Sequence, residues 1–467
     1  MPSFYSFAPT LDDLFQAGFL TRQLEEGLDS DLAYRRHATE ETIGGRLGSR
    51  IILPKVGRKA PVIQPLNPTN IVANLDNGLT PSLPSSETYE YNLQEWGDTE
   101  DVDLIGSTAA CANLVKMASR TNGVQAAQSM ERIAKIELFG SYDVGNTFCR
   151  TDLGASSTTV VYVDDIRGFQ YQMVNGVQEA VSVSNPLPVV EVRTTSGGIN
   201  QRFNVTGATA TGTNYSLYPG SSIDNVGNVV SDGISGFLTI SGAAQAPVNG
   251  DAIVATNAAI IKRPLNKPSI NMLTSSDTMT LSLILAAKQQ LVANNVPPMP
   301  DGTYHFIHDP FIQQQLFADQ QFLTAYASRF KSQEWQEGQI FELLGVTFIP
   351  TTEAYVQPPT PDVNINVTVR RSIMLGAEAL LQANYDGLDM YLNEPGSNYN
   401  PIGMCMLVSN VAQIIRPPID RMQRLLSLTW TWIGDFTCPT DVTATQVIIP
   451  TGSSAQFKRA VVIETAG

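Results

Sequence analysis

The sequence predicts an α+β protein made of several folding units. Its 467 residues suggest two to four such units, and a hydrophobic fraction of 43% is enough to build sizeable cores. Apolar residues with helical spacing are confined to a few segments, whereas short β-rich runs bounded by Gly, Pro and Asn recur along the chain. Separate helical and strand-rich stretches are typical of the α+β class.

Charged residues are scarce and mostly acidic. They make up 16% of the chain, which is low for a soluble protein, and the net charge is −15. A protein that binds DNA without sequence preference needs a basic face that displaces counterions, and this composition excludes that class. The scarcity of charge indicates either a surface covered by other copies of the chain or a β-rich domain with a polar, uncharged surface.

Residues 1–45 are predicted to form an arm, in which Thr10 caps a short helix from Leu11 to Gly18. This arm has too few apolar residues to form a core, so it must lie on the same subunit or on a neighbour. Residues 46–104 then predict a long hairpin with strands Arg50–Val56 and Ser86–Trp96. Because a two-stranded ribbon of this length is unstable alone in water, its apolar face also needs a partner.

The charges of this hairpin are unevenly distributed. The stretch 46–59 carries bases and no acid, and the stretch 87–103 carries acids and no base. Either the two halves neutralise each other across the hairpin, or the basic half lies on the acidic half of the next subunit and sets the register of assembly. The candidate inter-subunit contact residues are therefore Arg50, Lys55, Arg58 and Lys59 on the basic half, and Glu95, Asp98, Glu100, Asp101 and Asp103 on the acidic half.

Residues 105–140 are predicted to be helical, with Ser107 or Thr108 as the cap. We expect Asn122-Gly123 to break or bend this helix and Gly140 to end it. One apolar stripe runs along the second part, with polar residues such as Glu131 and Lys135 around it. The stripe comprises Ala126, Ala127, Met130, Ile133, Ala134 and Leu138.

Residues 150–263 change character and predict an inserted β-rich domain. Charged residues become sparse, and short strand-like runs alternate with turn signals such as Asp232-Gly233. The recurring strand runs argue against a low-complexity loop. The expected strands are Thr158–Val163, 188–192, 236–240 and 251–255.

Helices and strands mix from residue 264 to residue 415. Asp277 is expected to cap a helix that carries Leu281 to Leu291, and Pro310 to open a second helix at its first turn. A strand is predicted at Leu343–Ile349. Residues 416–467 are strand-rich, with strands expected at Leu426–Phe436, Thr443–Ile449 and Arg459–Glu464.

No catalytic or metal-binding constellation is present in the sequence, so the chain is predicted not to be an enzyme and to need no cofactor or metal. His305 and His308 lie on an expected strand, where a spacing of three points them to opposite faces. Asp164-Asp165 and Asp301 are interpreted as solvated surface carboxylates. None of the four cysteines forms a CxxC pair or a zinc pattern; Cys111 and Cys405 are expected in the core.

No targeting or membrane segment is expected. Residues Met1 to Tyr5 lack the basic region and apolar run of a signal peptide. No apolar run reaches 18 residues, the length that a membrane helix needs. A disulfide scaffold is not expected in a chain this long, so a reducing cytoplasm is the expected compartment of assembly.

Three short motifs and the order of the elements resemble a known family. The motifs are Pro300-Asp301-Gly302-Thr303-Tyr304, then Ile307-His308-Asp309-Pro310, and then Glu337-Gly338-Gln339-Ile340 with Gly345-Val346. This pattern resembles the major capsid proteins of tailed bacteriophages, which have the Hong Kong 97-type fold, and locally a coat-protein family of short-tailed coliphages. The segment 150–263 has no counterpart in that pattern.

The resemblance implies a domain order and a structural role. It implies an N-terminal arm (1–45), an extended loop (46–104), a peripheral domain with a long spine helix (105–149), the inserted β-rich domain (150–263), an axial domain (264–415) and return strands of the peripheral domain (416–467). Copies of the chain are expected to form hexamers and pentamers of an icosahedral shell in the virion. The implied partners are other copies, a scaffolding protein, the portal and a decoration or cement protein. The shell is expected to enclose double-stranded DNA without sequence-specific binding and without a membrane.

Two other functions remain open from the residues alone. A β-rich subunit of a surface array or an adhesin would suit the segment 150–263, although no export signal accompanies it. An enzyme with a β accessory domain would need a nucleophile paired with a base, and the sequence offers none.

Overall fold

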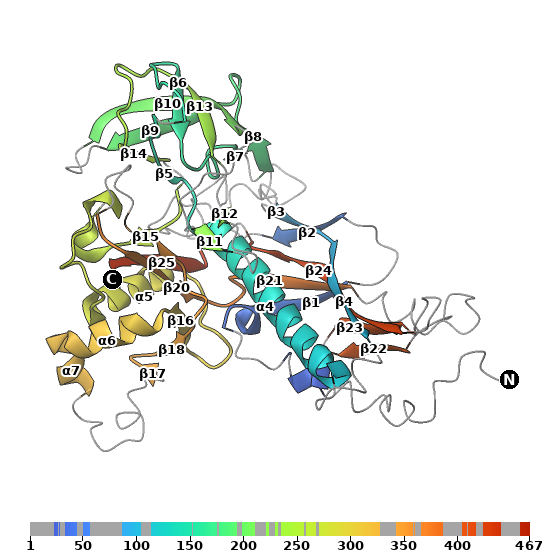
Figure 1. Ribbon diagram of the computed structural model, residues 1–467. Coiled ribbons are helices and arrows are strands. Elements are labelled where there is room, and N and C mark those ends of the chain that lie inside the picture. Colours follow the sequence, from blue (N-terminus) through green and yellow to red (C-terminus); the bar gives the residue numbers. More distant parts are fainter. Residues whose placement is uncertain are drawn as a thin grey trace, which may run out of the picture. The chain divides into compact units, whose positions relative to one another are not determined.

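A computed structural model of the chain divides into two compact units, each assembled from three segments of the sequence (Figure 1). Unit 1 comprises Met1–Ile52, Glu90–Glu137 and Leu380–Thr437, and unit 2 comprises Leu53–Tyr89, Leu138–Ala379 and Cys438–Gly467. The structure describes residues 23–26, 28, 33–43, 50–56, 86–103, 114–151, 153–174, 177–193, 199–210, 221–223, 229–231, 235–255, 258–267, 270–326, 342–357, 359, 366–385, 404–408, 410–416, 424–439 and 458–467. In this described part, no helix is both long and apolar enough for a membrane span.

Unit 1 is built on a six-stranded sheet. Its spatial order is β1 (Thr39–Ile43), β21 (Leu381–Tyr385), β24 (Leu425–Thr437), β23 (Val411–Arg416) and β22 (Met404–Val408), and β4 (Gln94–Asp103) also pairs with β24. β24 confirms the strand expected at Leu426–Phe436. Its 13 residues alternate between buried and half-buried along most of the strand, as a strand with one covered face must. The buried set includes Leu426, Leu428, Trp430, Trp432 and Phe436.

The long helix α4 (Leu114–Tyr142) covers this sheet with its part up to Glu137. The expected break at Asn122-Gly123 is wrong, because the helix runs through both residues over its full 29 residues. The side-chain amide of buried Asn122 donates to the backbone oxygen of Leu428, so the group that competes with helical hydrogen bonds is satisfied by the sheet. The helix also passes Gly140, its expected end. The predicted apolar stripe is buried, with Ile133 only partly covered.

The described part of the N-terminal arm lies on its own unit. Leu24 and Tyr34 are buried, a short 3-10 helix follows at Arg35–His37, and β1 pairs in parallel with β21. Of the two positions expected for the arm, residues 33–43 therefore adopt the one on the same subunit. The helix expected at Leu11–Gly18 lies outside the described residues.

β2 (Arg50–Val56) and β3 (Ser86–Asn92) pair as a two-stranded sheet and confirm the hairpin. The return strand does not continue to Trp96 as expected, because the strand is interrupted at Leu93. From Gln94 the chain pairs with β24, in register from Gln94 opposite Gly434 to Asp103 opposite Leu425. This long-range pairing separates β4 from the hairpin.

Six of the described strands between Asn146 and Val254 in unit 2 form a small closed barrel. The sheet order is β5 (Asn146–Phe148), β14 (Ala252–Val254), β9 (Leu187–Arg193), β10 (Ile199–Ala210), β13 (Gly236–Ser241) and β6 (Val160–Val163). The amide of Asp164 donates to Phe148 and the amide of Arg150 donates to Tyr162, so the residues that follow β5 pair with β6 and close the sheet. Closure removes the free edges of the sheet.

The barrel interior is apolar and confirms the strand runs read from the sequence. Its core comprises fourteen buried residues from β6, β9, β10, β13, β14 and the adjoining segments, including Val161, Val190, Phe203, Leu238 and Ile253. β6, β9, β13 and β14 coincide with the four expected strands within one or two residues. Two short hairpins accompany the barrel, β7 (Tyr171–Val174) with β8 (Val177–Ala180), and β11 (Ser221–Ile223) with β12 (Val229–Ser231).

The rest of unit 2 is a seven-stranded sheet, called the second sheet below. Its order is β15 (Ile261–Lys262), β25 (Ala460–Ala466), β20 (Val369–Leu375), β16 (Tyr304–His308), β18 (Val346–Pro350) and β17 (Glu342–Leu343), and β19 (Val356–Gln357) pairs with β20. α5 (Leu281–Ala293), α6 (Pro310–Ala318) and α7 (Gln320–Tyr326) pack on it through a core that includes Leu291, Phe306, Leu316 and Phe322. Short 3-10 turns lie at Pro264–Asn266 and Ile270–Met272.

Three local expectations for unit 2 need correction. Thr280, not Asp277, caps α5 by accepting from the amide of Leu283, because Asp277 is already bound by Thr274 and Lys267. The strand expected at Leu343–Ile349 is split into β17 and β18 by a tight turn at Leu344-Gly345. Pro310 does open α6, and Asp309 caps it, as the sequence predicts. The strand expected at Arg459–Glu464 is confirmed as β25, whereas the one at Thr443–Ile449 lies outside the described residues.

Candidate functional site

The acidic candidate residues all lie on β4. Glu95, Asp98, Glu100, Asp101 and Asp103 are exposed along this ten-residue strand. Among the described strands β4 pairs only with β24, so β4 is an edge strand of that part of the sheet. A row of carboxylates on an edge strand discourages indiscriminate strand pairing and favours a basic partner.

The two faces of β4 differ. Alternation along a strand places Asp98 on the same face as half-buried Trp96 and buried Val102. That face is turned toward α4, because Asp98 accepts a 2.6 Å hydrogen bond from the Gln125 amide. The opposite face carries Glu95, Asp101 and Asp103 and is lined by hydroxyls.

The described hydrogen-bond donors to Glu95, Asp98 and Asp101 are neutral. The hydroxyl of Thr431 donates to Glu95 at 3.2 Å, and the hydroxyl of Ser427 donates to Asp101. Gln125 and the backbone amide of Thr99 donate to Asp98. Such bonds orient the carboxylates without cancelling their charge, so the strand keeps a negative surface.

The basic candidate residues are only partly described. Arg50 begins β2 and is exposed, and Lys55 lies on β2 with its side chain outside the described part. Arg58 and Lys59 lie outside the described residues. The structure thus brings the five acids together on one strand, and the pairing of acids with bases stays a prediction.

A second carboxylate arrangement, which sequence reasoning missed, holds the described part of the arm. Glu131 of α4 is 3% exposed and accepts three backbone hydrogen bonds, from Ala33 at 2.9 Å, Tyr34 at 2.8 Å and Arg35 at 3.0 Å. Successive amides that converge on a carboxylate make a strong, charge-assisted contact. The sequence signal was a glutamate beside the apolar stripe, which we interpreted as an ordinary polar position.

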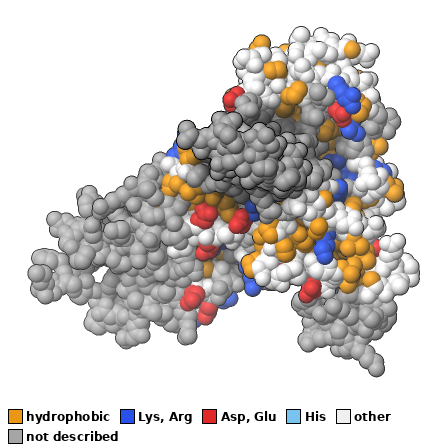
Figure 2. All heavy atoms as spheres, turned by 180° about the vertical axis from the view of Figure 1, so that it is seen from behind, with side chains coloured by type: hydrophobic (Ala, Val, Ile, Leu, Met, Phe, Trp, Pro, Cys, Tyr) orange, Lys and Arg blue, Asp and Glu red, His pale blue; other side chains and the backbone are white. Residues whose placement is uncertain are grey.

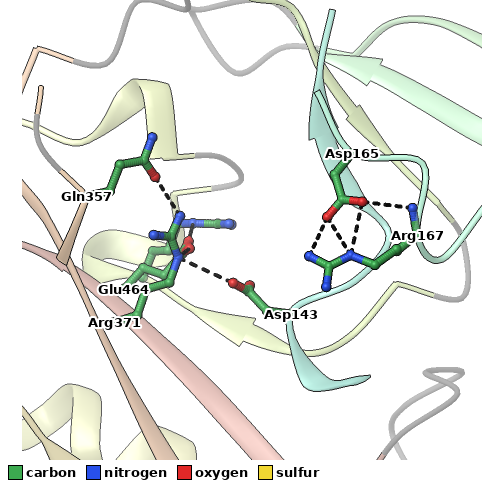
Figure 3. Close-up of polar contacts among 7 residues, drawn as sticks. Asp143, Asp165, Arg167, Gln357, Arg371 and Glu464 are labelled. Atoms are coloured by element: carbon green, nitrogen blue, oxygen red, sulfur yellow. Dashed lines mark hydrogen bonds and ion pairs between the residues drawn. The ribbon is translucent and has the colours of Figure 1, made fainter. Parts of the chain in front are cut away.

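A third arrangement, the buried charge cluster, lies inside unit 2 (Figure 3). Arg371 of β20 is fully buried; it donates to Glu464 of β25 at 2.9 Å and to Gln357 at 2.8 Å, and its Nε lies 3.3 Å from Asp143. Arg263 donates to the other oxygen of Glu464 at 2.7 Å. The sequence signal is a charged residue inside an apolar strand run, Val369 to Leu375 and Ala460 to Ala466.

The same close-up shows Asp165 and Arg167 joined by several hydrogen bonds, the shortest 2.6 Å (Figure 3). Burial lowers the pKa of Arg167, but the adjacent Asp165 carboxylate outweighs burial and raises that pKa above its usual range. Asp164 forms a buried ion pair with Arg150 at 2.9 Å beside the barrel closure. The expectation that Asp164-Asp165 are solvated surface residues is therefore wrong, because each has an arginine partner.

The described residues present no metal centre. No group of three or more His, Cys, Asp or Glu side chains within them is placed to hold an ion. His305 and His308 lie on β16 as predicted; His305 binds Asp301 at 2.6 Å, and His308 is buried and bonded to the backbone oxygen of Asp309. Cys149 and Cys438 are buried thiols outside any disulfide, and the side chains of Cys111 and Cys405 lie outside the described part.

No protein-family model matches the sequence, and no curated protein matches it. Solved structures do. The capsid of Ralstonia phage GP4 is 10% identical, with a TM-score of 0.48 over 94% of this chain and 90% of that chain. The cyanophage Pam1 capsid asymmetric unit is 10% identical, with a TM-score of 0.47 over 91% and 87%. The head structure of Helicobacter pylori bacteriophage KHP40 is 8% identical, with a TM-score of 0.44 over 91% and 88%. All three matches extend over most of both chains at low sequence identity.

Proposed function

We propose that this chain is the major capsid protein of a tailed bacteriophage, located in the virion. The observation that carries the proposal is β4, an edge strand of the described part of the sheet with five exposed carboxylates, of which Glu95, Asp98 and Asp101 accept hydrogen bonds from neutral donors. This strand follows directly from a hairpin whose outgoing half is basic. A surface that is charged, extended and self-complementary along one chain suits repeated contact between copies.

Three further features support a shell-forming role. The described arm segment is anchored to a long helix by Glu131, the helix is uninterrupted for 29 residues, and the hairpin β2–β3 is a two-stranded ribbon. In the view of Figure 2, uncharged side chains dominate the described surface. A rigid helix and a weakly charged surface suit a subunit that is covered on several sides by its neighbours.

Under this proposal each predicted segment has a role. The arm (1–45) and extended loop (46–104) reach neighbouring copies, the peripheral domain (105–149 with 416–467) contains the spine helix α4, and the axial domain (264–415) lies toward the capsomer centre. The inserted domain (150–263) braces or projects from the shell. Hexamers and pentamers enclose double-stranded DNA, and assembly in the host cytoplasm involves a scaffolding protein, the portal and a decoration or cement protein.

Two complementary charge reversals test the proposal. One variant carries Glu95→Lys, Asp98→Lys, Glu100→Lys and Asp101→Lys; the other carries Arg50→Glu, Lys55→Glu, Arg58→Glu and Lys59→Glu. We expect the unaltered chain to form shells, tubes or capsomers in electron micrographs, and each variant alone to fail. A mixture of the two variants should assemble again, because the basic half of one copy then meets the acidic strand of the other.

The mixture distinguishes the two interpretations of the hairpin charges, which are neutralisation within one chain and contact between chains. If the halves neutralise each other within one chain, mixing restores nothing, whereas combining both sets of reversals in one chain does. Reversal of the exposed Glu25 and Glu26, two acids outside β4, is the control for adding positive charge elsewhere on the chain and should leave assembly intact. An unaltered chain that stays monomeric at high concentration, with a scaffold supplied, contradicts the proposed function.

A further inference from the structure

Two exposed leucines of unit 2 have an unusual backbone conformation. Leu265 has φ 55° and ψ 22°, and the following Asn266 has φ 55°. Leu344 has φ 53°, and the following Gly345 has φ 71°. Each pair forms the centre of a turn with two consecutive left-handed residues, a turn in which Asn, Asp or Gly normally occupies the first position. Leucine in that position is strained and is not explained by the turn itself.

The first turn is held rigidly on both sides. The amide of Lys267 donates to Pro264 across the turn at 3.2 Å. Before the turn, Arg263 is anchored to the fully buried Glu464 at 2.7 Å; after it, Lys267 is anchored to the buried Asp277 at 2.5 Å. Between these two ion pairs the Leu265 side chain is 87% exposed. A strained conformation persists only where its surroundings enforce it, and such outliers concentrate at functional sites.

The second turn is built in a similar way. The Lys288 ammonium of α5 donates to the backbone oxygen of Leu344 at 2.5 Å. A side chain in place of Gly345 would meet this ammonium at 2.8 Å, so the lysine is seated directly against the turn. The Leu344 side chain is nevertheless 52% exposed. In both turns a strained backbone conformation therefore carries an apolar side chain that is exposed to solvent.

The two turns lie at opposite corners of the second sheet. β15 and β17 are the first and last strands in its main order, as the labels in Figure 1 also show. β15, β25, β16 and β18 point in one direction, because β15 is parallel to β25, β16 is parallel to β18, and β20 is antiparallel to both β25 and β16. The Leu265 turn follows the end of β15, and the Leu344 turn precedes the start of β18. The leucines thus mark different edges and different ends of one sheet.

We infer that Leu265 and Leu344 are apolar anchors of a contact between neighbouring copies of this chain. The inference rests on the proposed function and deepens it by naming residues of the contact. Copies arranged head to tail in a ring use two different surfaces of each subunit, one facing each neighbour. Leu265 and Leu344, on opposite edges of one sheet, provide one contact site for each of two neighbours. A two-fold dimer would need a single surface patch.

The chemistry of the turns favours a second copy as the partner. The central pairs, Leu265-Asn266 and Leu344-Gly345, carry no charge, and the bases beside them are already bound to Glu464, Asp277 and a backbone oxygen. A head-to-tail contact joins two different surfaces of the chain, and an uncharged turn whose neighbouring bases are already bound brings no unpaired charge into that contact.

Asparagine substitutions provide the test, because Asn tolerates the left-handed conformation and removes the apolar side chain. We compare full-length Leu265→Asn and Leu344→Asn with the unaltered chain by analytical ultracentrifugation, electron microscopy and thermal unfolding. Each variant should keep or raise its thermal midpoint by about 1–2 °C as strain is relieved. Each should also need about tenfold more protein to assemble. Val183→Asn, which removes an 83% exposed valine of the barrel region that has no positive φ, is the matched control and should assemble like the unaltered chain.

Three outcomes overturn the inference. Assembly of Leu265→Asn at the concentration of the unaltered chain shows that this leucine anchors no copy. A loss in Val183→Asn equal to that in Leu265→Asn shows that the turns have no special role. A fall in thermal midpoint with loss of assembly shows that the leucines serve folding only. Failure of the unaltered chain to assemble is a failure of the proposed function, and the unaltered sample alone reveals it.

Discussion

Strand β4 and the buried charge cluster both concentrate acidic residues but use them in opposite ways. On β4 five carboxylates are exposed, and the described hydrogen-bond donors to Glu95, Asp98 and Asp101 are hydroxyls and amides. In the cluster, Glu464 is fully buried and bonded to two arginines. A buried carboxylate is tolerated only when it is paired and hydrogen-bonded, whereas an exposed one can remain available. The first set is thus suited to association and the second to a unique internal arrangement.

Arg371→Met should produce the largest change, because it removes the cation that faces Glu464 and Asp143 in a fully buried site. We expect the free energy of unfolding to fall by about 3–5 kcal/mol, measured by urea denaturation. Arg202→Met, in an ion pair whose arginine side chain is 56% exposed, is the control and should cost about 0–1 kcal/mol. Equal losses in the two variants would contradict the contrast between buried and exposed charge.

Acid should destabilise the protein through His308, a buried side chain whose described hydrogen bond is to the backbone oxygen of Asp309 and not to a carboxylate. Burial lowers the pKa of His308 from 6.5 to about 4, although the nearby Asp309 opposes this shift. The unfolded chain therefore binds the proton more readily, and stability that is complete above pH 6.5 is lost as the pH falls toward 4. We expect a loss of about 3 kcal/mol over this interval.

The measurement is the free energy of unfolding as a function of pH for the unaltered chain and for His308→Gln. The glutamine variant should lack this part of the pH dependence while keeping the part due to carboxylates. Parallel curves for the two proteins between pH 6.5 and 4 would show that His308 does not carry the effect.

Glu131→Gln tests a buried carboxylate that accepts hydrogen bonds from three backbone amides. Glutamine keeps one acceptor oxygen and turns an NH₂ group toward an amide donor, so we expect a loss of about 1–3 kcal/mol. The sensitive measurement is proteolytic cleavage within residues 33–43, which should become faster. Glu25→Gln changes an exposed glutamate of the same segment and should leave the cleavage rate unchanged.

Neutralising β4 should have the smallest effect on folding. A variant with Glu95→Gln, Asp98→Asn, Glu100→Gln and Asp101→Asn should change the free energy of unfolding by less than about 1 kcal/mol, because exposed carboxylates contribute little to it. Its self-association should weaken and lose its salt dependence. A large loss of folding stability with unchanged association would show that the β4 carboxylates stabilise the fold and do not contribute to association, which is the opposite of our expectation.

The sequence was most informative where structure depends on neighbouring residues. Alternation predicted β24, and Asp309-Pro310 predicted the start of α6. It was misleading where a residue distant along the chain provided the hydrogen-bond partner of a side chain that would otherwise disrupt the local structure. Asn122-Gly123 would break an isolated helix, but the oxygen of Leu428, far along the chain, satisfies the Asn122 amide. The acids of β4 were found from composition, whereas the role of Glu131 was not, because its donors come from the arm.

By itself the sequence determined the α+β class, most strand positions, the charge asymmetry of the hairpin and the resemblance to a capsid family. These follow from side-chain periodicity and composition, which act over a few residues. Only the tertiary structure decided the closure of the barrel at Phe148 and Asp164, the pairing of β4 with β24, and the cluster at Arg371. These features join residues that are distant along the chain, and their registers and partners are selected by which buried polar groups can be satisfied together.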